Sequence, residues 1–182
     1  VGVADWRASA ANMEDSVLAN SGFEAGSNQV ADIWTSFGKN ATRDGITARS
    51  GLYAGKAFGE FSGQPNFAGF MQNFSAKAGQ QWVASVWVRQ NADDPLTGQC
   101  EAFAKIEFYN KDGGFIDALE AADRISSTSP KDLFVRSSVL SVAPPETATV
   151  RFVAMFAQFD GKSKGSVFFD DGELHQVIPS EK

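Results

Sequence analysis

Short runs rich in apolar residues, separated by turn residues, follow one another along the chain from Ser16 onward. Within many of these runs apolar and polar residues alternate with a period of two, as in strands whose side chains point alternately to opposite faces. Glycine, proline, asparagine and aspartate gather between the runs, which is typical of turns. The pattern predicts strands over residues 16–24, 32–37, 42–48, 53–61, 67–76, 81–90, 100–110, 133–142, 149–159 and 166–177.

Regularly spaced strands of this kind predict an all-β fold, an antiparallel sandwich or barrel. The only helical signal is residues 118–123, where one or two helical turns are expected inside a long connection. A chain of 182 residues suits a single domain. We expect this domain to span residues 16–178, between a tail or linker over residues 1–15 and a short tail over residues 179–182.

Charge and residue counts exclude several classes of function. The chain has 16 basic and 22 acidic side chains, a net charge of −6, which argues against binding to nucleic acid or to an anionic membrane surface. No apolar stretch is long enough to span a membrane. A single cysteine, Cys100, excludes an internal disulfide and a multi-cysteine zinc site. A single histidine, His175, argues against histidine-rich metal sites and weakens any Ser-His-Asp scheme.

Three of the predicted strands each combine an apolar face with a face that carries aromatic or charged side chains. If these strands lie in one sheet, its outer face presents six such side chains together: Trp87, Arg89, Lys105, Glu107, Tyr109 and Arg151. Flat aromatic rings stack on pyranose faces, and charged groups form strong hydrogen bonds with hydroxyls. The pattern therefore predicts a carbohydrate-binding face.

A second interpretation of these residues is structural. Loops commonly cover large aromatic side chains on a sheet face, which would leave Trp87 and Tyr109 without a ligand. The charged side chains would then be solvated cross-strand ion pairs of little energetic weight. The grouping of rings with charges favours the carbohydrate-binding interpretation.

Acidic residues lie near both ends of the predicted domain. Glu24 ends a glycine-flanked segment, and Asp170 and Asp171 follow two phenylalanines in the last predicted strand. Calcium takes six to eight oxygen ligands, usually carboxylates and backbone carbonyls. If the first and last strands are neighbours, Glu24, Asp170 or Asp171, and carbonyls of residues 49–51 supply such a set.

Four groups of residues, in this order, resemble motifs of the jelly-roll carbohydrate-binding modules that are appended to secreted glycoside hydrolases and bind xylan or glucan. Each motif is loose, but together they extend over about residues 16–175. The matching segments are 20–24 with Trp34, 50–53, Gln72 followed by 78–89, and 143–145 followed by 150–152 and 167–171.

This resemblance implies a two-sheet antiparallel β-sandwich, a jelly roll, whose concave sheet forms a glycan cleft that includes Trp87 and Arg89. It implies a structural Ca²⁺ that joins the first and last strands, with Glu24 and Asp170 at the ligand positions. It also implies a non-catalytic, monomeric module that binds a polysaccharide or oligosaccharide and holds a larger extracellular protein on glycan. The segments 93–100 and 115–131 are longer than the family pattern, so the resemblance does not determine which residues form the edges of the cleft.

Two other functions remain compatible with the sequence: an adhesion or structural domain, and a small polysaccharide-cleaving enzyme, either a glycosidase or a lyase. The same sandwich serves as an adhesion or structural domain of secreted or cell-surface proteins, because a fold does not settle a function. A small glycosidase needs two facing carboxylates, and only Glu107 is expected on the cleft face. A polysaccharide lyase needs a base near a charge-neutralising group, for which Tyr109 with Arg89 is the plausible set.

Overall fold

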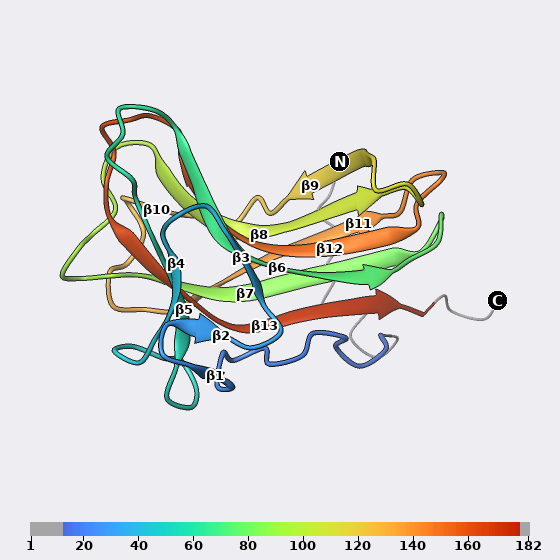
Figure 1. The fold of residues 1–182 in the computed structure, drawn as a ribbon, viewed down its shortest axis with the longest axis horizontal. Helices are drawn as coiled ribbons and strands as arrows, with labels where there is room; N and C mark the ends of the chain where they lie inside the picture. Colours follow the sequence, from blue (N-terminus) through green and yellow to red (C-terminus); the bar gives the residue numbers. More distant parts are fainter. Residues whose placement is uncertain (1–12, 179–182) are drawn as a thin grey trace.

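The computed structural model describes residues 13–178, which form two antiparallel β-sheets packed face to face (Figure 1). The described range contains strands, turns and bends but no helix, and accordingly no helix in it is long and apolar enough to cross a membrane. The expected all-β, two-sheet antiparallel sandwich is confirmed.

The larger sheet is built from six strands: β3 (Thr35–Phe37), β6 (Asn66–Ser75), β8 (Cys100–Tyr109), β9 (Phe115–Glu120), β10 (Ile125–Ser126) and β12 (Thr149–Gln158). Its order is β10, β8, β12, β6, β3, and β9 pairs with β8 on the side that faces away from β12. Ten residue pairs join β12 to each of its neighbours β6 and β8, so these three long strands form the centre of the sheet.

The smaller sheet is built from five strands: β4 (Ala41–Asp44), β5 (Ala54–Phe58), β7 (Gln81–Gln90), β11 (Val135–Val142) and β13 (Ser166–Val177). Its order is β11, β7, β13, β5, β4. A β-bulge between Asp170 and Glu173 shifts the register of β13 against β7. A separate small hairpin joins β1 (Gly26–Ser27) to β2 (Val30–Ala31).

Aromatic side chains fill the space between the two sheets. Phe70 of β6 meets Phe169 of β13 at 6.4 Å between ring centroids, which links the inner faces. The Trp34 ring stacks on Phe23 at 4.8 Å and lies 5.8 Å from Phe152. Because each buried phenylalanine removes a large apolar surface from water, this core accounts for the pairing of the two inner faces.

The first described residues lie along the last strand. Met13 forms a bridge with Val177, and the amide of Val17 donates to the carbonyl of Leu174 at 2.9 Å. Residues 13 and 14 of the expected tail are thus paired with the body, while residues 1–12 and the expected tail 179–182 lie outside the described residues. Residues 16–24, predicted as a strand, contain no named strand and only run beside β13.

The expected helical turns over residues 118–123 are wrong. Residues 115–120 form β9, and Leu119 pairs with Ile106 of β8. The sequence of this segment has high helix propensity, but the open edge of β8 offers a ladder of backbone hydrogen bonds, and tertiary context overrides propensity.

The expectation that six side chains share one outer face is also wrong. Trp87 and Arg89 point outward from β7 in the smaller sheet, whereas Lys105, Glu107, Tyr109 and Arg151 point outward from β8 and β12 in the larger sheet. The long strands β6, β7, β8 and then β11, β12, β13 alternate between the sheets along the chain. The two groups therefore lie on opposite sides of the sandwich.

Candidate functional site

Four of the six predicted carbohydrate-binding residues do come together, on the outer face of the six-stranded sheet, which we call the sheet face. Pairing of β8 with β12 places Glu107 beside Arg151, and β6 adds Asn73 on the other side of Arg151. The Tyr109 hydroxyl donates to Glu107 Oε2 at 2.6 Å, and Arg151 Nη1 donates to the same hydroxyl at 2.7 Å. Lys105 Nζ lies 3.0 Å from Glu107 Oε1.

Charge in this cluster keeps the carboxylate ionised and the phenol protonated. Burial alone raises the pKa of Glu107, but hydrogen bonds from Tyr109 and Lys105 and the charges of Lys105 and Arg151 outweigh burial and lower that pKa. Burial, followed by the hydrogen bond to Glu107, raises the pKa of Tyr109 to about 12. At neutral pH the cluster thus offers fixed donors and acceptors.

The Tyr109 ring itself is already in contact on the sheet face. The Arg151 guanidinium lies over it, 4.2 Å from the ring centroid, and Phe115 packs against it edge to face at 5.8 Å. These contacts are those of a cross-strand polar cluster, the structural interpretation of the same residues. A sugar ring that stacked on the covered face of Tyr109 would have to displace Arg151.

Next to this cluster the sheet face is hollowed into an apolar trough of about 250 Å³. Phe103 and Met155 point outward from the sheet, yet they are only 1% and 9% exposed and form its floor. At its rim Phe67 and Phe159 are 46% and 41% exposed and meet edge to face at 5.9 Å. Lys105 also lines the trough and so joins it to the polar cluster.

Sequence reasoning missed Phe67 and Phe159. Both occupy odd-numbered positions in phase with the outward side chains of their strands, and Phe67 pairs with Ala157 of β12. Alternation in the sequence therefore predicts that both phenylalanines point outward. Only the antiparallel register of β6 and β12 brings them to the same end of the sheet.

Trp87 and Arg89 lie on the far side of the sandwich. The guanidinium of Arg49 lies 3.9 Å from the Trp87 ring centroid, and Arg89 pairs with Asp132 at 3.1 Å. A shallow polar hollow of about 470 Å³ lies beside Trp87 and is also lined by Arg136 and Glu173, which pair at 2.6 Å. The role of Trp87 in glycan binding stays a prediction.

Of the three predicted calcium ligands, the carboxylates of Asp170 and Asp171 lie near Gly22, and the side-chain stem of Glu24 passes the same residue. A side-chain carbon built on Gly22 would lie 3.4 Å from Asp170 Oδ1, 3.5 Å from Asp171 Oδ1 and 3.9 Å from Glu24 Cγ. Glu24 and Asp170 both accept backbone amides from the segment 49–53. The first and last parts of the domain therefore meet here, as calcium binding requires.

The fit to calcium is good for two of these residues. Asp170 is fully buried with no ion-pair partner among the described residues, and burial, with a smaller effect of Asp171, raises its pKa to about 6. Asp171 instead pairs with Arg49 at 2.6 Å, which leaves Glu24 and Asp170 as the better oxygen donors. Within residues 13–178 no three acidic, histidine or cysteine side chains form a complete metal-binding group, so backbone carbonyls or water would have to complete the shell.

Solved structures share this architecture. The CBM22-1 xylan-binding domain of Paenibacillus barcinonensis Xyn10C superposes with a TM-score of 0.60 at 12% identity, over 88% of this chain and 94% of that one. TmCBM61, solved with β-1,4-galactotriose, superposes with a TM-score of 0.55 at 14% identity, over 90% and 99%. The chain has the β-sandwich fold of these carbohydrate-binding modules.

The same fold also occurs inside larger proteins. The enzymatically active domain of bacteriophage CBA120 tailspike protein 4 superposes with a TM-score of 0.62 at 13% identity, and the chain covers only 21% of that protein. No protein-family model and no curated relative matches the sequence. At these identities the likeness establishes the fold.

Proposed function

We propose that the protein is a non-catalytic carbohydrate-binding module that binds a polysaccharide or oligosaccharide on the sheet face. The observation that carries the proposal is the exposed pair Phe67 and Phe159 beside a trough and a cluster of fixed polar groups. Modules of the same fold include a xylan-binding domain and a module solved with β-1,4-galactotriose, which supports this class of ligand.

Binding on the sheet face uses two kinds of contact. Exposed phenylalanine rings offer apolar surface to the axial hydrogens of a sugar ring, and the apolar area removed from water contributes roughly 25 cal/mol per Å². Lys105 and the nearby Glu120 offer a donor and an acceptor for hydroxyls at the wall of the trough. Since the groups are held by their neighbours before a ligand arrives, little side-chain entropy is lost on binding.

The electrostatics of the sheet face favour binding over catalysis. A glycosidase requires a general acid whose pKa is raised, whereas that of Glu107 is lowered. A lyase requires a base near neutral pH, whereas the pKa of Tyr109 is about 12. Arg89, the expected partner of Tyr109 in a lyase, belongs to the other sheet.

The test is affinity gel electrophoresis against xylan, β-1,4-galactan, mixed-linkage β-glucan and polygalacturonate. We expect at least one of these glycans to retard the protein. Phe67→Ala and Phe159→Ala should each weaken binding roughly tenfold, because each removes about 50 Å² of apolar surface that a sugar ring would cover. Trp87→Ala is the matched control, because it removes an aromatic ring from the opposite face.

Each other outcome has a definite meaning. Retardation that is lost in Trp87→Ala and kept in Phe67→Ala would move the site to the far face and overturn the proposed location. A folded protein that no glycan retards would overturn carbohydrate binding and favour the adhesion or structural alternative.

We also propose that Glu24 and Asp170 hold a structural Ca²⁺, and that the module is a monomeric part of a larger secreted protein. Calcium would join the segment before β1 to β13 and neutralise the buried Asp170. The likeness to modules of xylanases supports the placement in an extracellular enzyme.

A further inference from the structure

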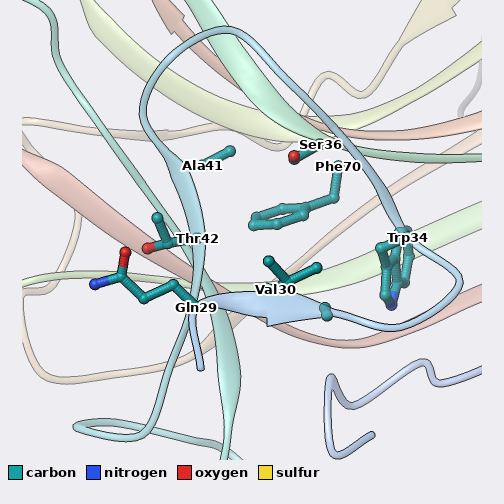
Figure 2. A pocket seen from close by; sticks show the side chains of 8 residues that line it. Gln29, Val30, Trp34, Ser36, Ala41, Thr42 and Phe70 are labelled. Atoms are coloured by element: carbon teal, nitrogen blue, oxygen red, sulfur yellow. The ribbon is translucent and has the colours of Figure 1, made fainter. Parts of the chain in front are cut away.

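A second pocket opens at the edge of the sandwich, and we call it the edge pocket (Figure 2). It has a volume of about 210 Å³ and lies where β3 of the larger sheet and β4 of the smaller sheet diverge. The side chains that matter for its chemistry are those of Gln29, Val30, Trp34, Ser36, Thr42 and Phe70.

One continuous segment of chain surrounds this pocket. Residues 29–42 run along β2, past Trp34, along β3 and back down β4, so that they encircle the Phe70 ring (Figure 2). The two ends of this segment are joined by a hydrogen bond, because the amide of Arg43 in β4 donates to the carbonyl of Gln29, just before β2, at 2.8 Å. The pocket is therefore already formed in the folded protein and needs no rearrangement.

Its aromatic wall is rigid. The indole Nε1 of Trp34 donates to the carbonyl of Asn20 at 2.7 Å, and the ring stacks on Phe23 with an interplanar angle of 10°. Phe70 packs against both rings from the larger sheet, at 5.0 Å from Phe23 and 6.4 Å from Trp34. A ligand in the edge pocket would meet ordered aromatic edges, which lowers the entropic cost of binding.

The backbone is strained at Ile33, the residue that precedes the pocket-lining Trp34. Ile33 has φ of +73° although it is β-branched, and its side chain is 67% exposed. Such residues are genuine outliers, and strained positions cluster at ligand sites. Val30, which lines the pocket, is 65% exposed, so its apolar side chain stands in solvent without burying against the core.

The polar side chains of the lining define the ligand. In the described part of the chain, the side chains of Gln29, Ser36 and Thr42 make no hydrogen bond to protein; Gln29 and Ser36 are exposed to water and Thr42 is half-buried. Figure 2 shows Gln29 and Thr42 on one side of the pocket and Ser36 on the other. None of the lining side chains is charged, so an ionic ligand would lose its hydration without a partner. A purely apolar ligand would leave two hydroxyls and an amide unsatisfied.

We propose that the edge pocket is a second binding site, which takes one neutral sugar ring at the end of a glycan chain. Its volume lies below the roughly 300–1,000 Å³ of sites for drug-sized ligands, which limits the occupant to about one ring. The choice of a sugar among neutral hydroxyl-bearing ligands rests on the proposed function.

The edge pocket and the sheet face are neighbours that share β3. Ser36 pairs with the inward-pointing Phe70 and faces the edge pocket, whereas Thr35 pairs with Met71 and Phe37 with Gly69 on the sheet face. The terminal sugar in the edge pocket and the rest of the glycan on the sheet face would therefore both contact β3. Occupation of both sites by one glycan would raise the overall affinity through effective concentration.

The test is a titration followed by ¹H–¹⁵N correlation spectra, with D-xylose, D-glucose and D-galactose as neutral probes and D-glucuronate as a charged one. We expect saturable shifts of the Trp34 indole N–H and of amides in residues 29–42 for at least one neutral sugar. Ser36→Ala and Thr42→Val should each weaken this binding about fivefold, because each removes one hydroxyl while nearly preserving volume.

Thr35→Val is the matched control, since it removes a hydroxyl from the same strand on the other face and should leave the titration unchanged. The proposal is overturned if no neutral sugar shifts residues 29–42 at about 50 mM, where even a millimolar site is filled. Tighter binding of glucuronate, or equal affinity in Ser36→Ala and Thr42→Val variants whose spectra show a native fold, overturns it as well. Retention of polysaccharide in gels without these shifts would reject the edge pocket and leave the sheet face intact.

Discussion

At the scale of single residues, two arginines stack on the aromatic rings that the sequence predicts to bind sugar. Arg151 covers Tyr109 and Arg49 covers Trp87, at 4.2 and 3.9 Å from the ring centroids. A guanidinium is planar and weakly hydrated, so it stacks on an aromatic face and still pairs with a carboxylate. Open aromatic surface on the sheet face comes instead from Phe67 and Phe159, with Phe115 exposed beside Tyr109, and the sequence pattern does not indicate any of the three.

Glu107 gives a prediction of pH dependence at the same scale. Its pKa is lowered in the folded protein, because its hydrogen bonds and the charges of Lys105 and Arg151 outweigh burial, and it returns to about 4.3 on unfolding. Such a carboxyl stabilises the fold above its unfolded pKa, and the contribution is lost as pH falls through the folded pKa. We expect Glu107→Gln to lower the free energy of unfolding at neutral pH.

The measurement is urea unfolding of both proteins at a series of pH values. The difference between them should shrink as pH falls below about 4. A difference that is the same at every pH would show that the charge of Glu107 does not stabilise the fold. Asp112→Asn, in an exposed turn, serves as the control for loss of one negative charge.

At the scale of elements, the pairing of β6 with β12 depends on Gly69. A side chain at this position would collide with the carbonyl oxygen of Ala154 and come within 3.1 Å of the Phe37 ring. We expect Gly69→Ala to destabilise the protein by about 2–3 kcal/mol, because backbone on the neighbouring strand cannot give way. Thermal or urea unfolding measures the loss.

Gly63→Ala is the matched control for this substitution. Gly69 has a φ of +155° and Gly63 one of +77°, but a side chain at Gly63 meets nothing within 4 Å. Its cost should be only the conformational penalty of about 1 kcal/mol. Equal losses in the two variants would show that the close approach of β6 and β12 is unimportant.

Strand positions were more predictable than strand partners. Residues 81–90 and 166–177 were predicted as strands and form β7 and β13 with those bounds, because alternation reports local burial. Alternation says which residues point inward but not into which sheet a strand is built. Alternation alone therefore predicts Trp87 beside Tyr109, although their strands belong to different sheets.

At the scale of the whole molecule, calcium is expected to fasten the start of the domain to its last strand. Removal of Ca²⁺ with a chelator should lower Tm by about 5–10 °C relative to the protein with Ca²⁺ at about 100 times its dissociation constant. Glu24→Gln should reduce this difference, while Asp112→Asn should keep it. Equal Tm values with and without Ca²⁺, measured by calorimetry, would rule out the site.

The sequence by itself determined the fold class and the position of most long strands, because these follow from local alternation and from motif order. Only the tertiary structure decided which outward side chains become neighbours. Consecutive long strands alternate between the two sheets, so contacts on either face join residues far apart in sequence, such as Phe67 and Phe159. The edge pocket likewise exists only where β3 and β4 separate at the sandwich edge.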